Sequence, residues 1–210
     1  MGKIFKIPKK SNFKIRKPEK VNESERIFFD LAKLLNIDID DIYLGGSYLL
    51  NKNESSSDID ILVKKLKNIS HVSKKIKELV SRINYQLPYK KSFHRRRFIF
   101  RGKVICPFGI DKNESFFEKS KFVKIRSLEK IQAKVMDSSL SLLSPSRYKI
   151  KVNNKDLFLI SYFVGHNNLL REGEVISLKA NLFEFTKGNK KVFAYVIPIE
   201  GTWIEIINRR

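Results

Sequence analysis

The sequence contains few residues that form covalent cross-links or zinc sites. Its 210 residues include one cysteine, Cys106, and three histidines. A single cysteine excludes disulfide bonds within the chain and zinc clusters made of cysteines, and the three histidines are too scattered to form a zinc site. One cysteine also agrees with a reducing compartment.

Long apolar runs are absent as well. No stretch approaches the roughly 18 to 20 residues that a membrane span needs, and the start MGKIFKIPKK has no apolar stretch after it that would make a signal peptide. We therefore expect a cytoplasmic protein without a membrane partner. With 42% hydrophobic residues, the chain is long enough to bury a core in one large domain or two small ones.

Acidic residues are scarce relative to basic ones, at 22 against 43, and the excess is uneven. Residues 1–20 carry eight basic and one acidic side chain, and residues 64–103 carry fourteen and one; residues 21–63, between them, carry three and nine. A charged surface that only keeps the protein soluble would explain this distribution. The alternative is a surface for nucleic acid or a nucleoside triphosphate (NTP) around a metal site.

The apolar pattern of the first half predicts alternating helices and strands. Glycine and proline positions mark the turns between them, and a hairpin is expected to turn at Arg101-Gly102-Lys103. The expected elements are a helix within 23–37, strands at 41–46 and 58–63, a helix at 70–83 and a β-hairpin within 95–111.

Two acids, Asp58 and Asp60, stand one residue apart in the stretch SSSDIDILV. Strand residues two apart share a face, so both acids would leave the polar face while Ile59 and Ile61 anchor the other. Like charges this close repel unless a cation or a set of donors lies between them. The pair therefore predicts a divalent metal site with Asp58 and Asp60 as ligands.

A glycine-rich turn, Gly45-Gly46-Ser47, precedes the acid pair. Glycines let backbone N–H groups approach a ligand without a Cβ in the way, and the helix start expected after the turn favours phosphate. Ser47 adds a hydroxyl. Gly45, Gly46 and Ser47 are therefore candidate nucleotide-binding residues, and the turn and acids together suit a metal-bound triphosphate.

This pattern resembles the DNA polymerase β-like nucleotidyltransferase superfamily. The family motif is an apolar residue, Gly, Gly or Ser, about nine to thirteen residues and then Asp-apolar-Asp. Here Leu44-Gly45-Gly46-Ser47 and Asp58-Ile59-Asp60-Ile61 match it with ten residues between them. More distantly, the whole chain is similar to archaeal predicted nucleotidyltransferases with a small β-rich region after the catalytic part. The resemblance implies an α+β fold, in which flanking helices cover a nucleotidyltransferase-type mixed sheet.

The same resemblance implies a reaction and its cofactor. A nucleoside monophosphate would pass from an NTP to an unknown hydroxyl acceptor, in association with nucleic acid. Asp58 and Asp60 would hold Mg²⁺ or Mn²⁺, and a third acid from a neighbouring strand would help to deprotonate the attacking hydroxyl.

The third acid is not evident in the sequence. Asp111 is the candidate catalytic residue, but Pro107 and Gly109 are expected to end the strand before it. Cys106 stands about where the acid would be. A nucleotide-binding or nucleic-acid-binding module that has lost the third carboxylate is therefore the alternative to an enzyme.

Basic residues at the start of the expected hairpin supply a candidate clamp. Arg95 and Arg97 would point the same way and bind triphosphate or a nucleic-acid backbone, because guanidinium binds phosphate in a bidentate manner. The alternative is an exposed edge strand that its charges keep soluble.

The last third of the chain changes in texture. Residues 127–137 are expected to be helical, and a serine-rich stretch then ends at Pro145. From Tyr148, five short alternating segments predict a small antiparallel β-barrel or sandwich. Its aromatic residues would either stack on nucleic-acid bases or fill the core. The expected division is a basic arm at 1–20, a nucleotidyltransferase-like domain at 21–144 and a β-rich domain at 145–210.

Overall fold

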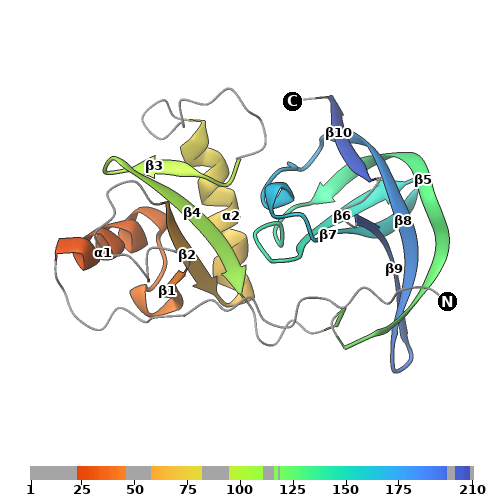
Figure 1. The fold of residues 1–210 in the computed structure, drawn as a ribbon, viewed down its shortest axis with the longest axis horizontal. Coiled ribbons are helices and arrows are strands. Elements are labelled where there is room, and N and C mark those ends of the chain that lie inside the picture. The colour runs from red at the N-terminus through yellow and green to blue at the C-terminus, as the bar shows by residue number, and fades with distance from the viewer. Residues whose placement is uncertain are drawn as a thin grey trace.

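Two β-sheets lie side by side in the molecule (Figure 1). The computed structural model describes residues 23–45, 58–81, 95–110, 116–117, 119–197 and 202–208. Within these ranges the chain forms ten strands, two α-helices and two short 3-10 helices. Neither α-helix is long and apolar enough to cross a membrane.

The smaller sheet carries the acid pair. Its strands are β1 (Ile42–Gly45), β2 (Ile59–Lys64), β3 (Phe98–Phe100) and β4 (Lys103–Ile110). They lie in the order β1-β2-β4-β3, with β2 and β4 parallel and the two outer pairs antiparallel. The two central strands, β2 and β4, therefore place their residues next to each other in the middle of the sheet.

Both α-helices pack on the same face of this sheet. In α1 (Glu23–Leu35) and α2 (Leu66–Val80), apolar residues recur at helical spacing and join Ile59, Ile61 and Val63 of β2 in one core. Asp60 alternates with these residues, so it faces away from the helices. The buried helix residues of this core are Phe28, Leu31, Leu35, Ile69, Val72, Ile76 and Leu79.

Strand β4 continues through Pro107 and Gly109, so the expectation that these residues end it is wrong. The Gly109 N–H donates to the Leu142 carbonyl at 2.8 Å, on the side away from β2. Backbone N–H groups alternate in direction, so Pro107 lacks its donor on that same side and no bond to β2 is lost. Glycine is required at 109 because a Cβ there would lie 2.7 Å from Cγ2 of Ile69.

The larger sheet closes into a barrel. Its strands are β5 (Lys121–Asp137), β6 (Ser146–Val152), β7 (Lys155–Ser161), β8 (Val175–Lys187), β9 (Lys190–Ile197) and β10 (Trp203–Asn208). The order is β10-β8-β5-β6-β7-β9, and an additional pairing of β8 with β9 completes a ring of five strands. Only β7 and β9 pair in parallel. Numbered along the chain, the ring runs 1-2-3-5-4, which is the connectivity of an OB-fold barrel.

Strand β8 has three neighbours. It pairs with β5 along one edge, and its other edge pairs with β10 near the start and with β9 near the end. In Figure 1 the hairpin of β8 and β9 extends beyond the rest of the barrel. The barrel interior contains Ala133, Val135, Tyr148, Ile150, Leu159, Ile176, Leu178, Tyr195 and Ile197, among others.

The expected α+β fold, a nucleotidyltransferase-type sheet with flanking helices, is wrong. The described residues are mostly β, in two sheets, and residues 127–137, expected to be a helix, belong to β5. Their Glu, Lys and Ala residues favour a helix, but Ile131, Ala133 and Val135 point into the barrel at a spacing of two. Pairing with β8 decides the conformation. The barrel thus begins at Lys121, within the range expected for the first domain.

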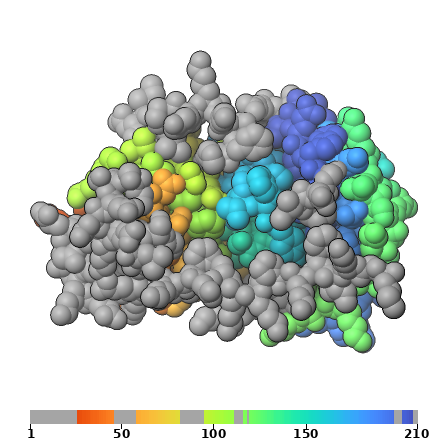
Figure 2. Space-filling model, in the orientation of Figure 1, coloured from red at the N-terminus to blue at the C-terminus, as the bar shows by residue number. Residues whose placement is uncertain are grey.

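Buried polar side chains join the two sheets. The hydroxyl of Ser73 in α2 donates to Oδ1 of Asn168 at 2.8 Å, and Arg95 forms an ion pair with Glu174 at 2.8 Å. Figure 2 shows the cyan segment that follows β7 directly against the yellow-green surface of β3 and β4. The acid pair is therefore held close to the barrel.

Candidate functional site

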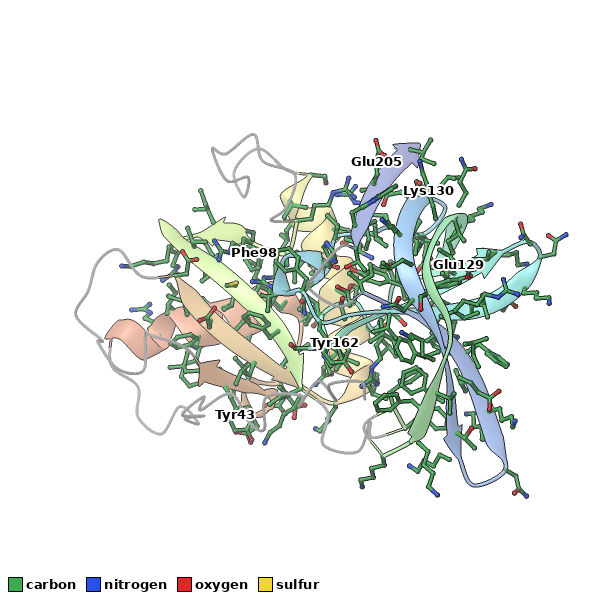
Figure 3. The ribbon with its side chains drawn as sticks, turned by 45° about the vertical axis from the view of Figure 1, so that its right-hand side comes forward. Tyr43, Phe98, Glu129, Lys130, Tyr162 and Glu205 are labelled. Atoms are coloured by element: carbon green, nitrogen blue, oxygen red, sulfur yellow. The ribbon has the colours of Figure 1, made fainter. Side chains whose placement is uncertain are left out.

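The acid pair lies on a row of residues that crosses three strands. Asp60 of β2 is opposite Gly45 of β1 and beside Cys106 of β4. Residues in register on adjacent strands share a face, so Asp60 and Cys106 project from the side away from the helices. Asp58 stands immediately before β2. In Figure 3, Phe98 marks this part of the sheet, because it pairs with the residue before Cys106.

One arginine contacts the first acid. Arg97 stands just before β3, and its Nη1 lies 3.1 Å from Oδ2 of Asp58. Both side chains are about one-third exposed, at 30% and 35%. The carboxylate expected to bind a metal ion is thus paired with a guanidinium.

A second arginine connects the site to the barrel. Arg96 is buried, and its Nε donates to Sγ of Cys106 at 3.3 Å. Its Nη1 donates to the carbonyl of Val164 at 2.6 Å, and its guanidinium lies 4.3 Å from the ring centroid of Phe108. Arg96 therefore fixes the thiol, β4 and the segment after β7 relative to one another.

Burial shapes the ionisation of the site. It raises the pKa of Asp60, and the hydrogen bond with Cys106 and the charge of Arg96 oppose this effect only in part. Burial also raises the pKa of the Cys106 thiol, so the thiol is protonated at neutral pH. Asp60 therefore loses its proton at a higher pH than an ordinary aspartate.

These residues do not fit a pair of magnesium ions. Two carboxylates and two guanidiniums balance each other in formal charge, which removes the electrostatic reason to bind further cations. Mg²⁺ prefers oxygen ligands, and Cys106 offers sulfur at the position next to Asp60. In the ranges that the structure describes, no group of three or more His, Cys, Asp or Glu side chains could hold a metal ion.

The remaining candidate residues divide into three sets. Gly45 ends β1 and lies in the row with Asp60, and its predicted role in nucleotide binding stays a prediction. Gly46, Ser47 and Asp111 lie outside the described residues, so the predicted triphosphate turn and the third acid stay predictions.

Arg95 has a different position from the one expected. It does not point the same way as Arg97, because residues 95 and 96 form a turn before β3. Its Nη1 donates to the Leu169 carbonyl and to Oε1 of Glu174, both at 2.8 Å. Glu174 is buried, so Arg95 belongs to the interface between the sheets rather than to a nucleotide clamp.

A second candidate surface lies on the outside of the barrel. In the pairing of β10, β8 and β5, Trp203 is opposite Lys179 and Lys179 is opposite Lys130. Four residues further along β5, on the same face, Lys134 is opposite Lys151 of β6. We call these five residues the lysine face.

The lysine face shares its orientation because its neighbours in sequence point inward. Leu178, Ala133 and Val135 fill the barrel interior, so Lys179 and Lys134 point outward. Figure 3 labels Lys130 on β5 and Glu205 on β10, on the two sides of β8. Polar and apolar residues alternate in KIQAK, residues 130–134, which is typical of a strand with one outward face. The helix expected at 127–137 led us to miss this signal.

Comparisons with known proteins identify no family. No family model matches the chain, and no curated protein matches it in sequence. A solved structure described as the tetrameric p202 HIN2 aligns over 80% of this chain and 80% of its own, with 8% identity and a TM-score of 0.31. A TM-score this low transfers neither a fold nor a function. Function is therefore inferred from the residues of this chain.

Proposed function

We propose that this chain is a cytoplasmic nucleic-acid-binding protein whose acid pair does not transfer nucleotides. The observation that carries the proposal is the row of Trp203, Lys179 and Lys130 across three neighbouring strands. Nζ of Lys130 lies 5.5 Å from the ring centroid of Trp203, so a cation and an aromatic ring form one surface. This combination binds a base by stacking and its phosphate by charge.

The extent of the lysine face supports a strand of nucleic acid as the ligand. Lys134 and Lys151 add a second pair of cations across β5 and β6, four residues from Lys130 on the same face. Glu205 of β10 and Asp156 of β7 border the face, and Asp156 lies 3.8 Å from Lys151. The positive surface is therefore a strip across the barrel. The net charge of +21 favours the approach of any polyanion to it.

The side chains beside the two acids are the reason that we expect no nucleotidyl transfer. Nucleotidyl transfer requires metal ions that stabilise the attacking and leaving oxygens together. Cys106 stands in register with Asp60, and Arg97 pairs with Asp58. A protonated thiol and a guanidinium at these two positions oppose the assembly of such a centre.

The cytoplasmic location has support from the only cysteine. Cys106 is the single cysteine of the chain, buried and hydrogen-bonded to Arg96, and a chain without a disulfide suits a compartment where thiols stay reduced.

Binding is tested with a labelled oligothymidylate, titrated at several salt concentrations. Replacing Lys130 and Lys179 together by alanine should weaken binding and lower the slope of log affinity against log salt by about 1.4, because each lost contact to a single strand contributes about 0.7. The matched control is Lys67→Ala, an exposed lysine of α2 on the other sheet. An unchanged slope in the double variant, or an equal loss in the control, would refute the proposal.

Trp203→Ala separates stacking from charge. It should weaken the oligothymidylate complex by about tenfold or more, since stacking is worth about 1–3 kcal/mol per base, and leave the salt slope unchanged. A duplex of matched length should lose little. Equal losses for both ligands would show that Trp203 does not stack on an unpaired base.

Transfer is tested with each α-labelled NTP, Mg²⁺ or Mn²⁺, and pooled RNA, DNA and protein acceptors. We expect no label in any acceptor. Transfer that Asp58→Asn abolishes would overturn the non-catalytic part of the proposal and leave the binding part to the oligothymidylate experiment.

A further inference from the structure

The first half of β5 is open to solvent along its length. Every residue from Lys121 to Leu128 is exposed. One edge of this segment pairs with β8, whereas β6 pairs with β5 only from Lys134 onward. Among the described residues, the second edge of Lys121–Leu128 has no strand partner. Backbone donors and acceptors on that edge are therefore available for another strand.

The side chains of this segment are unusually apolar for an exposed edge. Phe122 is 55% exposed and Val123 is 63% exposed, and Ile125 and Leu128 are close to half exposed. Phe193 of β9 is also exposed and lies in the same row as Val123, across one residue of β8. Contiguous exposed apolar side chains mark surfaces that a partner covers.

The charges of the segment indicate the chemistry of that partner. Lys121, Lys124 and Arg126 are cationic, and residues 121–128 include no acid. Arg126 is paired with Glu129 at 3.0 Å, which leaves the two lysines at the start of the strand to meet the partner. Charge complementarity therefore calls for an acidic partner with apolar residues between its acids.

Irregular pairing of β5 with β8 shortens the part of this edge to which another strand could pair. Pairing of β5 with β8 is regular from Lys121 to Lys124 and shifts register between Lys124 and Arg126, and again before Glu129. Leu128 has a positive φ of 45°. Bulges of this kind bend a strand and interrupt its edge, so the regular docking edge is short.

Two other occupants fit less well. A second copy of the chain would bring lysines against lysines, and the net charge of +21 on each copy opposes the pairing. Nucleic acid would satisfy the lysines, but bases stack on aromatic rings and gain little from Val123, Ile125 and Leu128.

We propose that the exposed start of β5, which pairs regularly over Lys121–Lys124, is a docking edge for an extended acidic segment of a partner protein, which adds a short strand to the barrel next to β5. Main-chain hydrogen bonds supply affinity in this binding mode, and the alternating side chains supply selectivity. Side chains of the strand alternate between its two faces, so valines or isoleucines of the partner cover Val123 on one face and its carboxylates meet Lys124 on the other. This surface is separate from the lysine face.

The test uses the full chain and a fluorescent peptide of alternating glutamate and valine. Saturable binding is expected, and Val123→Asp should weaken it by about tenfold or more, since it removes an apolar contact and adds a like charge. Lys155→Glu, at an equally exposed lysine where β7 begins, is the matched control and should change affinity by less than about twofold. Absence of binding, or equal affinity for Val123→Asp, would overturn the proposal.

A second peptide separates strand addition from charge attraction. It has the same glutamates, but alternate valines are replaced by proline, which removes backbone donors. We expect at least about tenfold weaker binding to the unchanged protein. Equal binding of the two peptides would show attraction by charge alone. If oligothymidylate competes with the peptide, and if Val123→Asp also weakens oligothymidylate binding, the edge is a nucleic-acid surface. This result, like equal binding of the two peptides, would refute a protein partner.

Discussion

Cys106 lies beside Asp60, in register, where parallel strands β2 and β4 meet. A thiol that donates or accepts weakly can lie next to a half-buried carboxyl without adding charge, whereas a carboxylate at 106 would add repulsion. The thiol therefore avoids the repulsion that a third carboxylate would bring to the site. Four charged side chains lie around the thiol, and their formal charges sum to zero. They are Asp58, Asp60, Arg96 and Arg97.

The two acids should respond differently to neutralisation. Burial raises the pKa of Asp60 in the folded state, so the folded protein binds more protons than the unfolded chain above pH 3.8, and stability falls as pH rises through that window. Asp60→Asn should therefore keep or increase the free energy of unfolding at pH 7. Asp58→Asn loses a partly exposed ion pair with Arg97 and should cost less than about 1 kcal/mol.

Urea denaturation at pH 7 and at pH 4 measures both effects. The advantage of Asp60→Asn should shrink at the lower pH, where the native acid holds its proton. A large loss of stability in Asp60→Asn at pH 7 would contradict this account and would mean that the ionised carboxylate supports the fold.

Gly109→Ala should destabilise the smaller sheet. The added Cβ would meet Cγ2 of Ile69 at 2.7 Å, and overpacking of this kind costs about 1–3 kcal/mol. The control is the double variant Gly109→Ala with Ile69→Ala, which removes the clashing Cγ atoms and should lose less stability than the two single losses added together. Simple additivity in thermal or urea unfolding would show that the clash is relieved elsewhere.

Arg95→Ala should affect stability far more than Arg97→Ala. Arg95 and Glu174 are 16% and 3% exposed, so removal of either partner leaves a buried charge and costs about 3–5 kcal/mol. Removing both should cost less than the sum of the single changes. Arg97→Ala, at a more exposed pair, serves as the comparison. A stable Arg95→Ala variant with weakened nucleotide binding would restore Arg95 to the clamp that the sequence suggests.

Lys77 should make stability depend on pH above neutrality. Burial lowers its pKa from 10.5 to about 8, although Glu172 opposes the shift, and Lys77 donates to Oγ of Ser138 between the sheets. Between pH 8 and 10.5 the unfolded chain binds the proton more strongly, so the free energy of unfolding should rise with pH in that window, by at most about 3 kcal/mol. Lys77→Met should abolish the rise, and Lys74→Met, an exposed lysine on the same helix, should retain it.

Local signals in the sequence predicted most elements of the smaller sheet. The helical spacing before Leu35 and the hairpin turn at Arg101-Gly102 are confirmed, and both turn residues have the positive φ that such a turn needs. These features depend on residues that are neighbours in the chain. Cys106, which the sequence placed about where a third acid would be, does lie next to Asp60, although the strand break expected at Pro107 and Gly109 is wrong and Asp111 stays outside the described residues.

Long-range partners could not be predicted in the same way. Nothing near Arg95 indicates that its carboxylate partner is Glu174, far along the chain. Likewise, SLEKIQAKVMD has the composition of a helix, and only the edge of β8 makes it a strand. Both errors concern contacts with the barrel. The sequence pattern predicts its strands one by one, but it does not show which strands pair with each other.

The position of β8 at the junction of three strands has a consequence for the newly synthesised chain. Lys121 pairs with Thr186, so β5 emerges from the ribosome well before the strand that must hold it. During that interval only the end of β5 can pair, with β6, and folding of the barrel cannot proceed strand by strand in the order of synthesis. The smaller sheet, by contrast, is complete once Ile110 has appeared. Translation therefore supplies all four strands of the smaller sheet before β5 can complete its pairing, although Leu142 and Leu143 of the same core follow later.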